Sequence, residues 1–417
     1  MKIFKFGGAS VKDADGVKNV LHVLETVGHE NVLLVISAMG KTTNALEVVV
    51  AHHFSKSNEF QESLQEVKKY HFQILLELFE DDTHPVFKAV NHLFEELEYF
   101  LSHNKSPNYD FVYDQVVGYG ELISTTIVSH YFASRGLKNQ WLDVRNFIKT
   151  DTTYRDAGVD WEQTQQLISK GVKRKSLNIT QGFLGADPNH FTTTLGREGS
   201  DYTAAIFAYC LNAESVTIWK DVPGVLNADP RYFENTTLLE QISYREAIEL
   251  AFYGASVIHP KTLQPLQRKE IPLHVKSFVN PLLPGTKVSK GADLVPHTSC
   301  FIVKKGQWLL SLSSIDFSFI MEEHISEIFN LLHHYQMRVS LIQNSAISFS
   351  VCVEDKFRHF QELKSALSKK FQISWNEDVS LFTIRHFTPE AVALVEEGKT
   401  VLLKQILGDT IQIVTKN

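Results

Sequence analysis

Two oppositely charged side chains flank the start of an expected helix at residues 195–205, which read Leu-Gly-Arg-Glu-Gly-Ser-Asp-Tyr-Thr-Ala-Ala. The planar guanidinium of Arg197 can pair with a carboxylate or a phosphate through two hydrogen bonds. Asp201 offers an oxygen that can hold a lysine or a metal ion. Ser200 or Asp201 stands where an N-cap is expected, and the free N–H groups of such a helix end bind anions. Because a capped helix behind an exposed loop fits the same residues, this stretch alone decides nothing.

A second stretch suited to phosphate binding lies at the N-terminus. Residues 1–6 alternate like a strand, Gly7 and Gly8 follow, and residues 17–27 have helical periodicity. A glycine pair between a strand and a helix lets backbone N–H groups approach a phosphate closely. Lys5 adds a positive charge beside that turn, so the two stretches together favour a site for a phosphorylated ligand.

Taken together, these two stretches resemble the motifs of the aspartate kinases in the amino-acid kinase superfamily. The resemblance runs from residue 1 to about residue 285 and is looser beyond it. It implies that ATP phosphorylates the β-carboxylate of L-aspartate to give 4-phospho-L-aspartate. That reaction is the first step toward lysine, threonine and methionine. Further matching stretches lie at residues 35–39, 120–122, 220–224, 229–231 and 254–261.

The hydrophobic pattern of the first part of the chain is typical of a parallel α/β sheet. The apolar run at residues 31–36 predicts a strand buried on both faces. Strand, helix and strand in this order indicate a right-handed βαβ unit. Ligands of such sheets bind beyond the carboxyl ends of the strands, where the glycine pair, Ser37 and an expected polar loop at residues 40–44 would meet. We therefore expect a three-layer amino-acid kinase catalytic domain over residues 1–290.

Two amphipathic helices are expected between residues 59 and 103, and a further helix between residues 114 and 134. His71, His84 and His92 fall on the first two helices. No second ligand has the spacing of a metal site, so we expect these histidines on helix surfaces rather than on a metal.

The pattern changes after a polar stretch that ends near residue 297. Residues 308–386 predict strand, helix, two strands, helix and strand, which is the ferredoxin-like α+β order. With the kinase resemblance upstream, residues 298–417 resemble a regulatory region of the ACT type, a module that binds amino acids between paired copies. The flanks, residues 300–304 and 389–417, would form a shortened second unit.

The resemblance assigns roles to individual residues. Lys5 and Asp201 are the expected catalytic residues: the ammonium stabilises the transferring phosphoryl group, and the carboxylate holds the ammonium in place. Glu121 would receive the ammonium of aspartate, and Arg197 a carboxylate. ATP would arrive with Mg²⁺, for which we expect no protein side-chain ligand. The expected aspartate-binding residues are Thr43, Glu121, Arg197 and Ser200. The expected ATP-binding residues are Gly7, Gly8, Ser10, Ser37, Lys220, Asp221, Leu226, Arg231 and Lys261.

Three residues depart from the family motifs. Ala9 and Lys220 each stand where a threonine is usual, and Ser256 stands where several members carry a phosphate-contacting lysine. Because each replaced group contributes a hydrogen bond or a charge, two alternatives stay open. One is a catalytically silent, effector-binding subunit, and the other is a different acid kinase of the superfamily, such as one for N-acetylglutamate. The retained charged residues favour an active aspartate kinase.

Composition limits the remaining classes. A chain of 417 residues suggests two or three domains, and 43% hydrophobic with 21% charged residues is typical of a soluble globular protein. A net charge of −7 gives no electrostatic case for nucleic acid. Cys210, Cys300 and Cys352 form no Cys-x-x-Cys motif and predict buried thiols in a reducing compartment. No apolar run predicts a membrane span or a signal peptide, so we expect a cytoplasmic protein.

Two positions in the ACT-like region bear on feedback by amino acids. In lysine-inhibited aspartate kinases an aspartate is expected where Ser340 stands, and a glutamate where Ala346 stands. A buried ammonium without a carboxylate lacks its compensating charge. We therefore expect lysine to bind weakly or not at all, while the module still joins two chains into a dimer. Which amino acid acts as the effector, if any, stays open.

Overall fold

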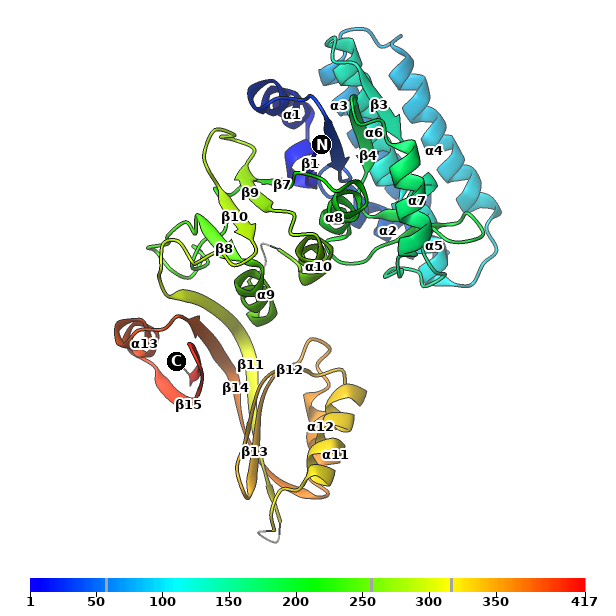
Figure 1. The fold of residues 1–417 in the computed structure, drawn as a ribbon. Helices are drawn as coiled ribbons and strands as arrows, with labels where there is room; N and C mark the ends of the chain where they lie inside the picture. The colour runs from blue at the N-terminus through cyan, green and yellow to red at the C-terminus, as the bar shows by residue number, and fades with distance from the viewer. Residues whose placement is uncertain (57–58, 256–257, 316–317, 417) are drawn as a thin grey trace. The chain divides into compact units, whose positions relative to one another are not determined.

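The computed structural model describes residues 1–417 except 57–58, 256–257, 316–317 and 417 (Figure 1). The chain forms two compact units. Unit 1 comprises Met1–Val225, Leu238–Ile248 and Val257–Pro296. Unit 2 comprises Leu226–Thr237, Glu249–Ser256 and His297–Asn417.

An eight-stranded sheet forms the centre of unit 1, in the order β3-β4-β2-β1-β7-β9-β10-β8. Its neighbouring strands run parallel except for β9 and β10, which pair antiparallel. All five residues of β2 are buried, as the apolar run predicted. The strands are β1 (Lys2–Phe6), β2 (Val32–Ile36), β3 (Asn139–Leu142), β4 (Leu177–Gln181), β7 (Ser215–Lys220), β8 (Gln241–Ser243), β9 (Leu273–Ser277) and β10 (Thr286–Ser289).

Helices cover both faces of this sheet. Successive side chains of a strand point to opposite faces, so each strand packs against both layers of helices. Phe4 and Phe6 of β1 join a core cluster with side chains of α1 and α6, whereas Lys5 contacts α8. The expected three-layer architecture is confirmed. The helices with residues in unit 1 are α1 (Ala14–Val27), α2 (Thr42–Phe54), α3 (Phe60–Leu78), α4 (Pro85–His103), α5 (Tyr109–Val117), α6 (Tyr119–Ser134), α7 (Trp161–Gly171), α8 (Gly199–Leu211), α9 (Tyr244–Tyr253) and α10 (Pro260–Arg268).

Three local predictions between residues 40 and 134 are wrong. Of the loop expected at residues 40–44, only Gly40 and Lys41 form a turn; helix α2 begins at Thr42, whose hydroxyl donates to the carbonyl of Met39 at 2.6 Å. The single helix expected at residues 114–134 is broken at Gly118, where a Cβ would lie 3.1 Å from a methyl of Thr192. His71 is fully buried rather than on a surface; its ring nitrogens contact Val67 O and Thr42 Oγ1, and burial lowers its pKa to about 4.

Unit 2 is built on one six-stranded antiparallel sheet in the order β12-β13-β11-β14-β16-β15. Strands β12-β13-β11-β14, with α11 and α12 on one face, have the ferredoxin-like arrangement that the sequence predicted (Figure 1). The residues expected as a shortened second unit form the other half, around α13. The elements are β11 (Cys300–Ser314), α11 (Glu322–His334), β12 (Arg338–Asn344), β13 (Ser348–Glu354), α12 (Phe360–Leu367), β14 (Phe371–Arg385), α13 (Pro389–Glu396), β15 (Thr400–Leu407) and β16 (Thr410–Lys416).

The described cysteines and helices bear on two further expectations. Cys210, Cys300 and Cys352 are free and buried, as expected. None of the helices that the structure describes combines the length and the apolar character needed to cross a bilayer.

Candidate active site

Three strand ends meet at one edge of the sheet in unit 1. The turns after β1, β2 and β4 are joined by backbone hydrogen bonds, from Gly40 N to Gly8 O at 3.0 Å and from Gly182 N to Ile36 O at 3.0 Å. Gly8 has no room for a side chain, since a Cβ there would lie 2.8 Å from the carbonyl oxygens of Ala38 and Gly40. The glycine therefore permits the close approach of two turns that the site requires.

A cavity of about 280 Å³ opens at this edge. It brings together six of the residues that the sequence singled out, from four separate segments of the chain. The six are Lys5, Gly8, Ser37, Thr43, Glu121 and Ser200. Its other lining residues are Ala38, Gly40, Phe183, Gly196, Glu198 and Gly199.

A buried ion pair lies against this cavity. Lys5 Nζ lies 2.6 Å from Asp201 Oδ1, and the side chains are 8% and 0% exposed. Lys220, at the end of β7, places its Nζ 3.9 Å from the other oxygen of the same carboxylate. Two ammonium groups thus share one carboxylate, and the group keeps a net positive charge suited to phosphate oxygens.

The start of helix α8 differs from its prediction. The helix begins at Gly199, and its N-cap residue is Glu198 in the left-handed conformation (φ 55°), without a side-chain capping bond. We expected Ser200 or Asp201 at that position. Asp201 instead lies within the first turn, where its carboxylate pairs with Lys5. Ser200 lies one residue earlier and faces the cavity.

Glu121 presents a buried carboxylate to the same cavity. It is 2% exposed, and its Oε1 accepts a hydrogen bond from Ala38 N at 3.3 Å. Its Oε2 is buried and has no hydrogen-bond partner within the part of the chain that the structure describes. Burial raises the pKa of this carboxyl to about 8, although the Ala38 N–H and the positive charge of Lys5 act in the opposite direction. An acceptor of this kind is suited to a ligand that brings its own N–H donors.

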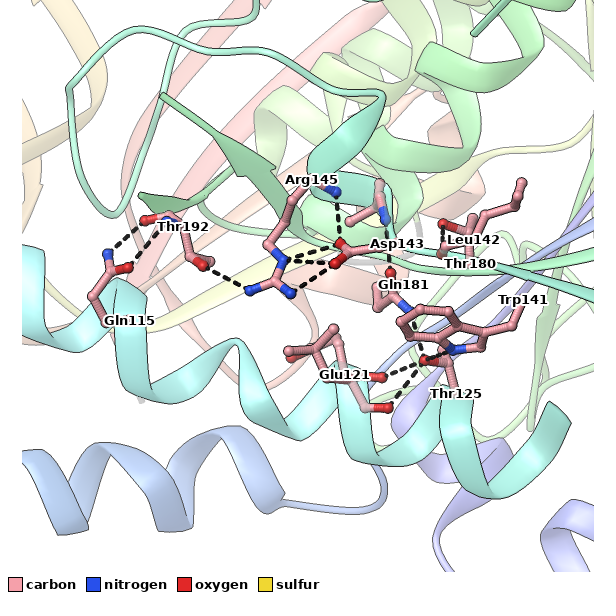
Figure 2. Close-up of polar contacts among 12 residues, drawn as sticks. Gln115, Glu121, Thr125, Trp141, Leu142, Asp143, Arg145, Thr180, Gln181 and Thr192 are labelled. Carbon is pink, nitrogen blue, oxygen red and sulfur yellow. Dashed lines mark hydrogen bonds and ion pairs between the residues drawn. The ribbon is translucent and has the colours of Figure 1, made fainter. Parts of the chain in front are cut away.

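Thr125 lies one turn after Glu121 on helix α6 and is the centre of a hydrogen-bond network, here called the Thr125 hub, that includes the backbone carbonyl of Glu121 (Figure 2). Thr125 Oγ1 donates to the carbonyl of Glu121 at 2.9 Å and accepts from Gln181 Nε2 at 2.7 Å and Trp141 Nε1 at 3.0 Å. Gln181 Oε1 accepts from Val144 N at 2.8 Å, which fixes the direction of its amide. Sequence reasoning missed this hub, since its members are ordinary polar residues without a recognisable spacing.

A second polar cluster in Figure 2 ties the segment after β3 to the antiparallel pair β5 (Leu184–Ala186) and β6 (Thr192–Thr194). Arg145 forks onto Asp143 at 2.9 and 2.7 Å and donates to Thr192 Oγ1 at 3.3 Å. The Gln115 amide pairs with both backbone groups of Thr192, at 2.8 and 3.0 Å. These contacts fix the segment that leads into the turn at Gly196.

Several expected site residues of unit 1 lie outside the cavity lining. Arg197 is exposed on the turn before α8, and Asp221 is exposed after β7. Ser10 is buried in the short 3-10 helix that follows Gly7. Lys261, in the first turn of α10, forms an ion pair with Asp156.

Other expected residues belong to unit 2 or fall outside the description. Leu226 is half-buried, and Arg231 is exposed with its guanidinium forked onto Asp229, the closest contact being 2.6 Å. Ser256, one of the three departures from the family motifs, lies outside the described residues. Among those that are described, no group of three or more His, Cys, Asp or Glu side chains is placed to hold a metal ion.

Comparison with protein-family models identifies the family to which the chain belongs. Residues 1–277 match the model described as the amino acid kinase family. The chain belongs to the amino acid kinase family. The lysine-sensitive aspartokinase 3 of Escherichia coli is 32% identical over 356 residues, which cover 84% of this chain and 78% of the relative. Within the family the chain therefore groups with the aspartokinases.

Solved structures agree with this placement. The crystal structure of E. coli aspartokinase III with lysine and aspartate (T-state) superimposes with a TM-score of 0.84 at 27% identity, over 99% of this chain and 95% of that one. The R-state structure with aspartate and ADP gives 0.80 at 27% identity, over 100% and 96%. By contrast, the chain spans only 42% of the bifunctional aspartokinase/homoserine dehydrogenase 2 of Arabidopsis thaliana, at 28% identity.

Proposed function

We propose that the chain transfers the γ-phosphoryl group of ATP to the β-carboxylate of L-aspartate. The observation that carries this proposal is the pairing of unlike groups on one cavity: the Lys5–Asp201 ion pair and the unpartnered Glu121 oxygen. A zwitterionic substrate satisfies both, since its ammonium bonds Glu121 while its reacting carboxylate faces the cationic side. An acylated nitrogen keeps one N–H but carries no positive charge, so such a substrate leaves the ionised Glu121 carboxylate buried without a counter-charge.

The reaction needs little covalent help from the protein. The β-carboxylate is already a nucleophile, so its oxygen attacks the γ-phosphorus without a general base, and the bond to the bridging oxygen of ADP breaks. Lys5 stabilises the charge that develops on the transferring group, and Asp201 keeps its ammonium in position. Thr43, Ser200 and Arg197 complete the aspartate site in this proposal.

In this proposal the nucleotide binds at the side of the cavity near the glycine turn after β1 and the lysines that pair with Asp201. The Gly7–Gly8 turn lies beside the ammonium of Lys5, and Lys220 adds a second positive charge, so both fit phosphate oxygens. Mg²⁺ would be held mainly by the phosphates, since Asp201 is engaged by two lysines. The further ATP-binding residues of this proposal are Gly8, Ser10, Ser37, Asp221, Leu226, Arg231 and Lys261.

The proposal extends to the organisation of the protein. We assign catalysis to residues 1–290 and regulation to an ACT-type region at residues 298–417, with amino acids as the class of effector. Two chains would pair through that region as a dimer in the cytoplasm. Size-exclusion chromatography with light scattering tests the dimer, and a monomer at micromolar concentration contradicts it.

The direct test is an acyl-phosphate assay with ATP and three acceptors: aspartate, glutamate and N-acetylglutamate. Hydroxylamine traps the product as a hydroxamate, and ADP release is followed in parallel. We expect both signals with aspartate and much weaker ones with the other two. A preference for N-acetylglutamate, or no aspartyl hydroxamate from folded protein, contradicts the proposal.

A further inference from the structure

Unit 2 contains a second cavity, of about 340 Å³, whose lining shares only Arg231 with the residues of the proposed reaction. Its walls come from the segment Leu226–Thr237, from β11 and β14, and from α13 with the turn that follows it. The lining residues are Arg231, Tyr232, Phe233, Val303, Lys305, Ser380, Phe382, Leu394, Val395 and Lys399.

The charged residues in the described lining of this cavity are all cationic. Arg231 is paired with Asp229, but Lys305 and Lys399 form no ion pair with a carboxylate of the described chain. Lys305 Nζ lies 4.5 Å from the centroid of the Tyr232 ring, and Lys399 Nζ donates to Val395 O at 2.9 Å. Both ammonium groups have N–H donors left for a ligand, because each carries three.

The remaining lining is largely aromatic and aliphatic. Phe382 is buried under Lys399, whose Nζ lies 5.4 Å from its ring centroid. Phe233 packs against Phe301 at a ring distance of 5.0 Å. Leu394 is 54% exposed, so an apolar group in the cavity would cover surface that water now contacts. Apolar walls with a few convergent polar groups are typical of small-molecule sites.

We propose that this cavity binds a small organic anion with an aromatic or other apolar body and without an ammonium group. Lys305 and Lys399 bind the carboxylate or phosphate, and the rings of Phe382 and Phe233 contact the body. An α-amino acid is disfavoured, because its ammonium would find no carboxylate in the lining and would be repelled by two unpaired lysines. Nothing in this assignment depends on the reaction proposed for unit 1.

The test is calorimetric titration of the full chain with a matched set of probes. 3-Phenylpropanoate carries the charge and the ring, 3-phenylpropanamide has lost the charge, and phenylalanine has gained an ammonium. We expect the propanoate to bind at least tenfold more tightly than either analogue, and more weakly as salt rises. Phenyl phosphate tests the second source of negative charge. Inorganic phosphate carries negative charge without a ring, so an affinity equal to that of phenyl phosphate contradicts the proposed apolar contacts.

Substitutions test whether the probes bind in this cavity. Lys305→Gln should weaken 3-phenylpropanoate binding by about tenfold, the effect of losing one charged hydrogen bond. Lys356→Gln is the matched control, since Lys356 also lies over an aromatic ring, at 5.6 Å from the Phe357 centroid, but outside the cavity. Lys5→Ala should leave binding unchanged. No binding of any probe, equal binding of acid and amide, an unaffected Lys305→Gln, or loss of binding in Lys5→Ala overturns the proposal.

Discussion

The two cavities differ in the signs of their charges. The cavity of unit 1 has Lys5 and Glu121 in its lining, and the lysine is paired with a fully buried carboxylate. In the cavity of unit 2 the charged residues of the described lining are all cations, and Lys305 is exposed and forms no ion pair with a described carboxylate. A lysine beside a carboxyl group that ionises to accept an ammonium fits a zwitterionic ligand, whereas cations over aromatic rings fit a simple anion. The charge pattern of a lining therefore narrows the class of ligand before any ligand is known.

Burial separates the two cavities further. Charges that are removed from water interact strongly and are little affected by salt, while exposed charges are screened within about 10 Å at ordinary ionic strength. We therefore expect large effects from substitutions at Lys5 and Asp201, and salt-dependent ones at the unit 2 cavity.

Removal of the buried ion pair should have the largest effect. Lys5→Ala should lower kcat by about two orders of magnitude or more, the usual scale for one electrostatic stabiliser of a transition state. Steady-state kinetics at saturating aspartate and ATP measures it. Lys12→Ala is the control, because that side chain is 64% exposed at the same end of the sheet. An unchanged kcat in folded Lys5→Ala would remove Lys5 from the mechanism.

The next largest effect should come from Glu121, whose pKa is raised to about 8 by burial. Below that pH the free protein holds this carboxyl protonated, and only the ionised form accepts the ammonium of aspartate. The KM for aspartate should therefore fall about tenfold for each pH unit up to pH 8 and then level off. Glu121→Gln should raise the KM and remove this dependence, while the KM for ATP stays constant. A pH-independent KM in the unaltered chain would show that this carboxyl does not bind the substrate.

Arg197 should have a smaller effect than Glu121, because it is exposed and lies outside the cavity lining. Arg197→Ala should raise the KM for aspartate by about tenfold, the contribution of one charged hydrogen bond. Arg197→Lys should rescue it only in part, since an ammonium cannot form the two-pronged pair. If the KM for ATP changes most, the assignment to aspartate is wrong.

Thr125 is a positioning residue, and its effect should be smaller again. Thr125→Val keeps the shape but removes the bonds to Gln181, Trp141 and the carbonyl of Glu121. We expect the KM for aspartate to rise a few-fold with kcat and the KM for ATP unchanged. Thr125→Ser should restore it. Equal changes in all three constants, with a lower melting temperature, would point to a purely structural role.

Added lysine should have the smallest effect. Ser340 stands where a lysine-binding carboxylate was expected, and it accepts a hydrogen bond from Lys304 Nζ at 3.2 Å. Burial lowers the pKa of Lys304, and the charge of Arg338 lowers it further, against the effect of Glu354. Lys304 and Arg338 already outnumber Glu354 there, so a further ammonium should bind weakly or not at all, and lysine should leave the activity unchanged. Sub-millimolar inhibition by lysine contradicts this prediction. It would show that unit 2, like the cavity of unit 1, binds a ligand with an ammonium group.

The sequence predicted the fold well where periodicity carries the information. The buried strand β2 and the ferredoxin-like order in unit 2 both follow from hydrophobic patterns. Glycine-rich motifs also predicted which turns meet, since Gly8 and the turn after β2 are joined in the structure. Helix starts were less predictable, because capping preferences cannot reveal that Asp201 already binds a distant lysine.

The supporting contacts of the site were beyond prediction from the sequence. Thr125 and Gln181 are 56 positions apart, and neither belongs to a motif. Their hydrogen bond exists because the parallel sheet brings the end of β4 beside α6. His71 shows the same limit, since its burial depends on packing between α2 and α3 that no single helix pattern contains. Local patterns specify elements, whereas side-chain networks depend on how the elements are packed.

The two long strands of unit 2 have a consequence for how this part of the chain unfolds. β11 and β14 pair from Cys300 with Arg385 to Ser314 with Phe371, so each strand passes through both halves of the sheet (Figure 1). A cut at the middle of either strand would leave unpaired edges in both halves. We therefore expect the two halves to unfold together, and a stable fragment to begin before Cys300 rather than at the start of the ferredoxin-like repeat.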